Sequence, residues 1–322
     1  MKTENGNEIL NIEHSDHNHN HSKDIKYLQL EQPVLVIDLK NKNDGIPSGL
    51  LPSIGRIVQQ ISSIGIHNVV LKSNDAELIR EFVKKTEGVR DVNFNIRMDL
   101  RSAHSFFTDS NKLESRYSLS CCINEVTEIA KHIGEIPQNV PVVLSVSNDN
   151  YSYLMDNIKP ISDAYPNILI ISAQLEMGEN KNNTITWENL DLLYCNIIDL
   201  LRKSSTKKIL MDYGILPIRL LTEHPCNGYV CSHGTCHSSK NNLPRRLYIN
   251  EDGNIIPEHI DMKPEYYLGN ILEKDLIDII DGYKDSTRHE NFLVLAKRVY
   301  TKWVQVCPYR VVHLSDLLMY MS

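Results

Sequence analysis

The stretch PVLVIDL, residues 33–39, decides how the fold of this chain is interpreted. It is a short run rich in β-branched apolar residues, and the turn-like segment NKNDG follows at residues 41–45. A run that is apolar at nearly every position is typical of a strand covered on both faces, as in a parallel sheet. The sequence therefore predicts that a buried strand opens the folded part of the chain.

A helical pattern follows this strand. Apolar residues recur with helical spacing from Ile54 to Ile64, Pro52 stands where a first turn tolerates proline, and Gly65 comes directly after the pattern. Together the two segments predict a strand–helix unit.

The same alternation continues along the chain. We predict further strands over residues 68–71, 92–100, 140–147, 168–175 and 208–211, and helices over residues 75–85, 119–133, 151–164 and 187–200. Six such units predict an α/β fold with a parallel sheet, wound either as an open doubly wound sheet or as a partial barrel. In both, ligands bind at the carboxyl ends of the strands. We therefore expect the functional surface at residues 38–42, 72–75, 99–101, 145–150 and 174–178.

Composition narrows the class of protein. The chain has 322 residues and a net charge of −7 without a basic stripe, which argues against nucleic-acid binding. No apolar run approaches the ~20 residues of a membrane span, and the first residues lack the features of a secretory signal. Seven cysteines, an odd number, without an export signal indicate cytoplasmic thiols or metal ligands rather than disulfides.

Both ends of the chain depart from this alternation. Residues 1–28 are polar and carry the His-rich run HSDHNHNH from His14, so we predict a disordered tail. The segment PCNGYVCSHGTCHSSKNNLPRRLYINEDGNIIPEHIDMKPEYYLGNI, residues 225–271, contains three evenly spaced cysteines and then a hairpin pattern over residues 246–256 with Asp252-Gly253 in its turn. Helices are expected over residues 272–282 and in the LSDLLMYM tail.

These motifs resemble the radical SAM family with a SPASM-type C-terminal domain. The resemblance lies in GTCHSSKNNLPRRLYINEDGNIIPEH, residues 234–259, in YYLGNI, in CPYRVVH from Cys307, and in the strand–helix pattern of residues 63–83. It implies a partial six-unit (β/α) barrel over residues 29–217 and a small irregular SPASM-like module with a β-hairpin over residues 218–322. It also implies iron–sulfur chemistry in peptide maturation.

The chain departs from the family at the S-adenosylmethionine (SAM) site. The family's first loop carries Cys-x3-Cys-x2-Cys, whereas the corresponding residues 40–51, KNKNDGIPSGLL, contain no cysteine. The family's Gly-Gly-Glu-Pro, which grips the SAM amine, is replaced by Lys72-Ser73-Asn74-Asp75. Three thiolates cannot be exchanged for Asn, Ser and Lys without losing the cluster. The chain is therefore identified as a degenerate, pseudo-radical-SAM member in which SAM is not expected.

The C-terminal thiols are the candidate metal ligands. Cys226, Cys231, Cys236 and Cys307 form a set that suits one [4Fe–4S] cluster or tetrahedral Zn. The alternative is that they are partly buried free thiols in a module that has lost its cluster. His313 stands where the family has a later cysteine, and His259 stands near the family's cysteine after the hairpin.

Other polar and thiol residues have simpler interpretations. Cys121 and Cys122 in the predicted helix, and Cys195, are expected in the core. Arg97, Asp99, Arg101 and Asp212 end predicted strands, where a surface ion pair is the expectation.

Two functions remain open on this sequence. The first is a non-catalytic partner that binds a precursor peptide or a catalytic radical SAM enzyme, with the hairpin over residues 246–256 as a candidate edge for β-augmentation. The second is an iron–sulfur enzyme that uses a retained auxiliary cluster for electron transfer or substrate ligation.

Overall fold

The structure is a computed structural model and describes residues 34–39, 50–110, 116–124, 129–165, 167–177, 183–203, 209–212, 214–218 and 244–322. Contacts between Cα atoms divide the chain into two compact units. Unit 1 holds the described residues between 120 and 220 and those from 307 to 316, and unit 2 holds the others. The His-rich tail, the loop at residues 40–49 and the cysteines at 226, 231 and 236 lie outside the described residues.

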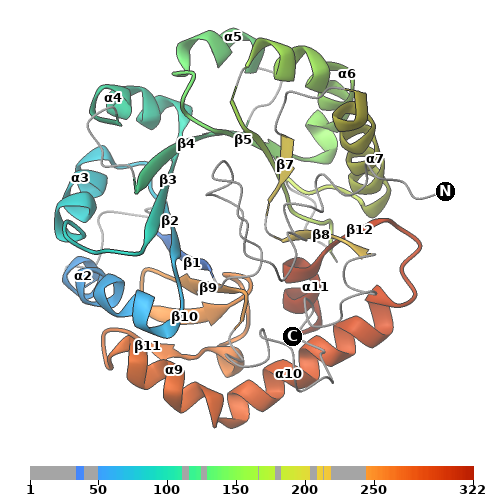
Figure 1. Cartoon of the computed structure of the whole chain (residues 1–322). Helices are drawn as coiled ribbons and strands as arrows, with labels where there is room; N and C mark the ends of the chain where they lie inside the picture. Colours follow the sequence, from blue (N-terminus) through green and yellow to red (C-terminus); the bar gives the residue numbers. More distant parts are fainter. Residues whose placement is uncertain are drawn as a thin grey trace. The chain divides into compact units, whose positions relative to one another are not determined.

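Unit 2 begins with three strand–helix units. The strands are β1 (Val34–Asp38), β2 (Asn68–Lys72) and β3 (Asn93–Asp99), and the helices that follow them are α2 (Leu50–Ile61), α3 (Ala76–Lys85) and α4 (Leu100–Ser110). The strands pair in parallel, β1 with β2 and β2 with β3. Figure 1 shows α2, α3 and α4 along the same side of these strands.

Local signals explain where these helices begin and end. Asp75 caps α3 by accepting hydrogen bonds from the backbone N–H groups of Glu77 and Leu78, at 2.9 and 3.1 Å. Gly65 stops the helical segment with φ of 81°, a left-handed conformation that glycine adopts without strain. The predicted ends of the first two helices are therefore confirmed.

An aromatic stack joins α3 to the helix-covered face of the sheet. Phe82 of α3 meets Phe94 of β3 edge-on at 5.6 Å between ring centroids, and Phe94 stacks on Tyr117 at 5.0 Å. At 1 % exposure or less, Phe82 and Phe94 are part of the core. Because side chains alternate across a strand, Asn95 and Arg97 point to the opposite face.

Three C-terminal strands and two helices complete unit 2. The strands are β9 (Arg246–Ile249), β10 (Asn254–Pro257) and β11 (Gly269–Asn270), and the helices are α9 (Leu276–Lys284) and α10 (Thr287–Val299), with a π-helical turn at Tyr300–Val304. The predicted hairpin is confirmed as the antiparallel pair of β9 and β10, with Gly253 at φ of 80°.

The hairpin does not offer the free edge that the sequence suggested. β9 pairs in parallel with β1, and β10 pairs on its other side with β11. Both strands of the hairpin therefore already have a neighbour on each side, so the hypothesis of β-augmentation there is wrong.

Unit 1 continues the strand–helix alternation. Its elements in the barrel are α5 (Ile129–His132), β5 (Val142–Val146), α6 (Asn148–Ala164), β6 (Leu169–Ala173), α7 (Trp187–Lys203) and β7 (Ile209–Met211). A small sheet pairs β8 (Ile215–Pro217) with β12 (Val311–His313). The helix α11 (Leu314–Met321) follows β12, as the tail pattern predicted, and has residues in both units. Figure 1 shows α6 and α7 on the outer side of β5 and β7.

One predicted helix is wrong. Residues 117–123 form the strand β4 (Tyr117–Ile123), and the helix expected over residues 119–133 is reduced to α5. These residues form a strand because Cys121 and Ile123 are buried and pair in register with Val142 and Leu144 of β5. Cys121 and Cys122 therefore lie in a strand rather than a helix, with Cys121 in the core as expected.

The described strands confirm the predicted fold class. Hydrogen bonding orders them as β11-β10-β9-β1-β2-β3-β4-β5-β6-β7, and β4 has residues in both units. β1 to β6 are each followed by a helix, so six strand–helix units precede β7. The chain is an α/β protein with a mostly parallel sheet, consistent with a partial barrel.

Candidate functional site

Three charged residues stand side by side at the carboxyl ends of the first three strands. Asp38 of β1 is in register with Lys72 of β2, and Lys72 is in register with Arg97 of β3. Side chains at paired positions point to the same face of a sheet. The next level below, Ile37, Leu71 and Ile96, points to the opposite, helix-covered face and is fully buried. The helix-covered face is thus apolar. The opposite face is polar at these strand ends and carries the buried Val36 and Val70 below them.

Lys72 lies between an acid and an aromatic ring. Its Nζ is 3.8 Å from Asp38 Oδ2 and 5.8 Å from the centroid of the Tyr248 ring. The side chains of Lys72 and Asp38 remain 28 % and 22 % exposed. Ion pairs that solvent reaches contribute about 0–1 kcal/mol, so this pair by itself adds little to the stability of the fold.

A chain of hydrogen bonds orients Arg97, which is buried at 6 % exposure. Its Nε–H donates to Asn95 Oδ1 at 3.1 Å, and Asn95 Nδ2 donates to Ser118 Oγ at 3.0 Å. The Ser118 hydroxyl in turn donates to the carbonyl of Phe94 at 3.2 Å. Because each donor meets an acceptor, the Asn95 amide is fixed and the guanidinium plane is set by it.

A second arginine lies on the same face at β9. Arg246 Nη1 donates to the Tyr248 hydroxyl at 3.0 Å, and the guanidinium carbon lies 5.9 Å from the Tyr248 ring centroid. The backbone N–H of Arg246 donates to Glu258 Oε1 at 3.1 Å. Tyr248 therefore contacts two cations, Lys72 and Arg246, through its ring.

The residues after Lys72 make hydrogen bonds at the starts of the helices α3 and α4. Ser73 Oγ accepts from the N–H of Asp75 at 3.1 Å, and Asp75 caps α3. Asn74 Oδ1 accepts from the N–H of Asp99 at 3.0 Å, and Asp99 Oδ1 accepts from the N–H of Ser102 at 2.7 Å. Asp99, a candidate from the sequence, is therefore held by the start of α4, and Arg101 is exposed.

In unit 1, one face of the sheet is apolar at one end and polar at the carboxyl ends of its strands. The face that carries Cys122 is apolar at its lower end, where Val143, Ile168, Ile170 and Leu210 form a buried cluster. At the carboxyl ends, Ser145 donates to Asn124 at 3.1 Å and Ser172 donates to Asp212 at 3.0 Å. Asp212 thus accepts a hydrogen bond from Ser172.

Of the four predicted metal ligands, only Cys307 lies among the described residues, where it is half-buried. Burial raises the pKa of its thiol above the ordinary value. The residues after it dock on α7. The Tyr309 hydroxyl donates to Glu188 Oε1 at 2.5 Å, its ring stacks on Trp187 at 5.8 Å, and the N–H of Arg310 donates to Asp191 at 2.6 Å.

That docking also changes the surroundings of two other groups. The hydrogen bond from Tyr309 is the main cause that lowers the pKa of Glu188. Arg310 contacts the Cys195 sulfur through Nη1, so Cys195 lies beside a cation rather than in the core that the sequence suggested.

His313 is buried in a pair with an acid. Its Nδ1 lies 3.1 Å from Asp316 Oδ1, and Asp316 Oδ2 accepts from the N–H of Leu175 at 2.6 Å. His259 Nδ1 accepts from the N–H of Asp261 at 3.1 Å. Within the described part of the chain, no group of three or more His, Cys, Asp or Glu residues is arranged to hold a metal ion.

Sequence reasoning placed Asp38 and Lys72 at the functional surface but missed Arg246, Tyr248 and the Asn95–Ser118 pair. The signal that could have found Asn95 is the strict alternation of β3, whose sequence is NFNIRMD. No comparable local signal marks Arg246, because its neighbour β1 is more than 200 positions away in the chain.

Among the comparisons with known proteins, only the one with solved structures finds matches, and these concern the fold. No family model and no curated protein matches the sequence. Among solved structures, SuiB from Streptococcus suis matches with a TM-score of 0.54 and 12 % sequence identity, over 82 % of this chain and 68 % of SuiB. SuiB bound to S-adenosylmethionine matches equally well, and SuiB bound to the precursor peptide SuiA matches with a TM-score of 0.53 at 11 % identity.

At this identity the likeness establishes the fold alone. It supports the radical-SAM-like barrel that the sequence motifs implied. Among the described residues, no helix has both the length and the apolar character that crossing a membrane requires.

Proposed function

We propose that this chain is a non-catalytic pseudo-radical-SAM protein of the cytoplasm that binds a precursor peptide, or a catalytic radical SAM enzyme, during peptide or protein modification. Its barrel serves as a binding scaffold. The reductive cleavage of SAM is performed elsewhere.

The observation that carries this proposal is an absence in the sequence. No cysteine occurs before Cys121, so the loop after the first strand has no thiolates for a SAM-anchoring cluster. A [4Fe–4S] cluster in this fold requires three thiolates and one open iron, and Asn, Ser and Lys do not replace them. The residues present therefore do not fit the group that the family's chemistry needs.

The end of the second strand supports the same proposal. Lys72 faces Asp38, and Ser73, Asn74 and Asp75 are engaged in capping and loop contacts. A lysine ammonium repels the amine and the sulfonium of SAM, whereas the family's glutamate attracts the amine. Both parts of the SAM site are changed in ways that oppose SAM binding.

A precursor peptide as partner is supported by the fold. One of the structures that shares it is a complex with the precursor peptide SuiA. A barrel with a polar, partly exposed face offers hydrogen-bonding groups to such a peptide without any cofactor.

A second function remains supported by the thiols Cys226, Cys231, Cys236 and Cys307. They suit one auxiliary [4Fe–4S] cluster, or Zn, in a SPASM-like C-terminal module over residues 218–322. In that case the chain is an iron–sulfur enzyme that uses the cluster for electron transfer or to ligate a substrate.

Two measurements on anaerobically purified protein test these functions. Incubation with SAM and dithionite is expected to give no 5′-deoxyadenosine above a protein-free blank, while an active radical SAM enzyme in parallel does. Iron and acid-labile sulfide are then quantified. Deoxyadenosine formation would end the non-catalytic proposal, and the enzyme alternative requires about four iron atoms with matching sulfide.

The partner is tested by co-purification. The tagged chain is expressed with the products of the neighbouring genes, including short open reading frames, and a stable complex with a short peptide or a radical SAM enzyme is expected. Failure of every neighbour to bind would contradict the proposed role.

A further inference from the structure

We propose that the exposed side of α10 and of the π-helical turn after it binds an acidic, amphipathic segment of the partner. This surface, the basic stripe, is made by Val294, Lys297, Arg298, Thr301, Lys302 and Val306, all within unit 2. The inference rests on the proposed function, because it names the chemistry by which the partner is recognised.

Helical spacing brings the residues of the basic stripe onto one side. The first four are separated by three or four positions, so they lie along the same side of α10. The turn Tyr300–Val304 that follows is π-helical, and the N–H of Gln305 donates to the carbonyl of Tyr300 at 3.2 Å. Because a π-helical turn takes about one residue more than an α-helical turn, Val306 follows Thr301 on that side. All six residues are exposed.

The stripe is basic although the chain as a whole is acidic. It carries Lys297, Arg298 and Lys302, and no acidic residue occurs in the sequence between Glu290 and Asp316. The whole chain, by contrast, has a net charge of −7. A positive surface on a negative chain favours a partner that presents a local group of carboxylates.

Contacts with neighbouring elements leave the stripe positive. Within the described ranges, no carboxylate forms an ion pair with Lys297, Arg298 or Lys302. The short helix η6 (Pro264–Tyr266) packs on α10 and brings Glu265 close to it. Burial is the main cause that raises the pKa of Tyr266; Glu265 raises it further and Arg298 lowers it, so both charges act on this phenol. Even with Glu265 set against Arg298, the two lysines remain unbalanced.

The acidic residues at the start of α10 are too distant to neutralise the stripe. Glu290 precedes Lys297 by about two helical turns, which is ~10 Å along the helix axis. Arg288, in the same first turn as Glu290, has the opposite charge. Figure 1 shows α9, which carries further aspartates, beside the start of α10 rather than its end. Because the Debye length is about 8 Å at physiological ionic strength, these charges are largely screened from the basic residues.

Exposed apolar side chains lie on both sides of the basic residues. Val294 is 59 % exposed and Val306 is 71 % exposed, and Leu293 and Trp303 of the same helical segment are exposed as well. Single exposed apolar residues are ordinary on a protein surface, but several around three cations offer area that an interface can bury. Basic residues in the last turn of a helix interact favourably with its dipole, which does not account for the apolar ones.

Charge favours a peptide segment over a membrane or a nucleic acid as the occupant. An anionic bilayer or a phosphate backbone is an extended negative surface, and it repels a chain with a net charge of −7. A short acidic segment meets only the stripe. Clusters that bind anionic lipids also contain about four to eight basic residues, more than the three here.

Fluorescence anisotropy with three labelled peptides tests the inference on the full chain. Each is N-acetylated, C-amidated and about 16 residues long, which covers the stripe in helical form. The first has leucines at both ends and glutamates between them, the second has glutamines in place of the glutamates, and the third has serines in place of the leucines. The first is expected to bind, and the other two about tenfold or more weakly, since each lacks one of the two kinds of contact. Phosphatidylserine vesicles are expected not to bind the chain.

Variants assign the binding to the stripe. Lys302→Glu is expected to weaken the first peptide about tenfold or more, because it places like charges opposite each other. Lys84→Glu, at an exposed lysine of α3, makes the same change of net charge and is expected to alter affinity less than about twofold. Val294→Gln is expected to weaken binding about threefold or more, whereas Leu192→Gln, at an exposed leucine of α7, is not. Circular dichroism confirms that each variant is folded.

Four results would overturn the inference: no binding of the first peptide, equal binding of the glutamine analogue, equal effects of Lys302→Glu and Lys84→Glu, or binding of the vesicles in place of the peptide. Its failure is distinguishable from failure of the proposed function. If a neighbouring gene product binds the chain and Lys302→Glu leaves that affinity unchanged, the partner role stands and the basic stripe is not its site.

Discussion

Replacing Gly214 with alanine tests how tightly the start of β8 is packed on β12. A Cβ at this position would lie 2.4 Å from Cε1 and 2.6 Å from Nε2 of His313, far below ordinary contact distance. The ring would have to move by about 1 Å to reach normal contact.

The His313 ring has little room to move. His313 pairs in register with Ile215, and the N–H of Leu314 donates to the carbonyl of Gly214 at 2.8 Å, so the backbones on both sides are fixed. Rotation of the ring would break its contact with Asp316, which is itself buried at 2 % exposure. Overpacking costs about 1–3 kcal/mol, and a weakened buried polar contact adds about 1–3 kcal/mol. We therefore expect Gly214→Ala to destabilise unit 1 by about 2–6 kcal/mol.

Urea unfolding monitored by fluorescence measures this loss. A Trp303→Phe background leaves Trp187, which lies in the same unit as Gly214, as the reporter. Gly134→Ala is the matched control, because a Cβ there meets no atom within 4 Å. Its effect is expected within about 0.5 kcal/mol. Adding His313→Ala to Gly214→Ala should recover part of the loss, as a double-mutant cycle reveals. Equal midpoints for Gly214→Ala and Gly134→Ala would refute the reasoning.

Three further predictions concern single side chains. Tyr283→Phe is expected to be neutral or to stabilise by about 1 kcal/mol in urea unfolding, because the buried hydroxyl has no hydrogen-bond partner among the described residues; a clear loss of stability would show that the hydroxyl is satisfied. Tyr309→Phe should raise the pKa of Glu188 toward its ordinary value of 4.5 in an NMR titration. Because the folded pKa is the lowered one, the stability from this contact is present above pH ~4.5 and is lost as pH falls through the folded pKa; an unchanged titration would contradict this. Cys307→Ser is expected to reduce the iron or zinc content of anaerobic protein, and Cys195→Ser is not; equal metal content in both variants would remove Cys307 from the proposed ligands.

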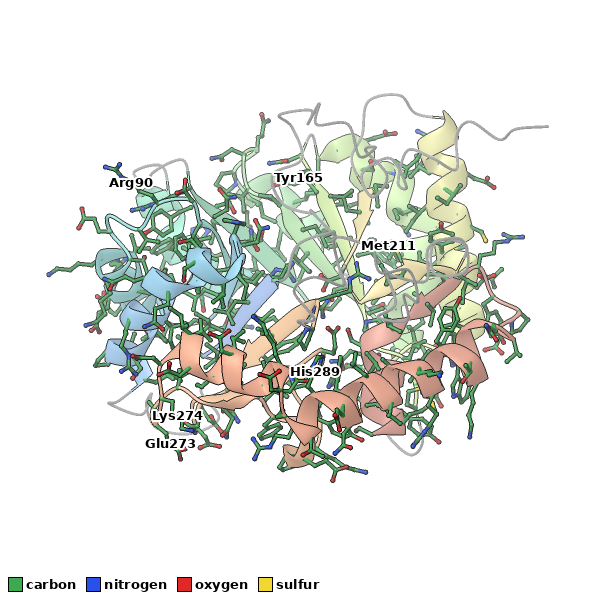
Figure 2. The ribbon with its side chains drawn as sticks, turned by 60° about the horizontal axis from the view of Figure 1, so that its bottom comes forward. Arg90, Tyr165, Met211, Glu273, Lys274 and His289 are labelled. Carbon is green, nitrogen blue, oxygen red and sulfur yellow. The ribbon has the colours of Figure 1, made fainter. Side chains whose placement is uncertain are left out.

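Among the described residues, a second buried polar group without a hydrogen-bond partner lies near the Tyr283 hydroxyl. The ring of His289 in α10, labelled in Figure 2, lies 5.1 Å from that of Tyr283 between centroids, and the two ring planes are tilted by 39°. Its Nδ1 lies 3.0 Å from the carbonyl of Lys284 and so carries the proton, which leaves Nε2 as an acceptor without a hydrogen-bond partner among the described residues. A donor and an acceptor buried in one place are the usual setting of an internal water. Comparing the free energy of unfolding of Tyr283→Phe with that of the parent protein therefore tests whether a water occupies this site.

The sequence predicted the strand–helix alternation but not all of its members. Six strands and five helices were predicted, whereas six strand–helix units precede β7 in the structure. Apolar runs and helix caps located β1, β2, β5, β6 and β7, since each is short and bounded by turn or capping residues. The pair formed by α4 and β4 was missed because the apolar residues of Tyr117–Ile123 continue toward Ile129 and imitate one long helix. Pairing of β4 with β5, which is not local in sequence, decides the outcome.

The candidate site was predictable only in part, for a related reason. Asp38 and Lys72 end apolar strands and are found by position alone. Arg246 and Tyr248 reach the same face only because β9 adds to the sheet beside β1, a parallel pairing between segments at opposite ends of the chain. The sequence showed a local hairpin there, and a hairpin pattern does not say which other strand it joins.

The alternation within β3 distinguishes the two sheet architectures that strand counting left open. A doubly wound sheet is covered by helices on both faces, so its central strands are apolar throughout. In β3 every second residue is polar, from Asn93 through Asn95 and Arg97 to Asp99, while Phe94 packs against α3. At β3 one face is therefore helix-covered and the other carries polar side chains, as in a barrel with a partly polar interior.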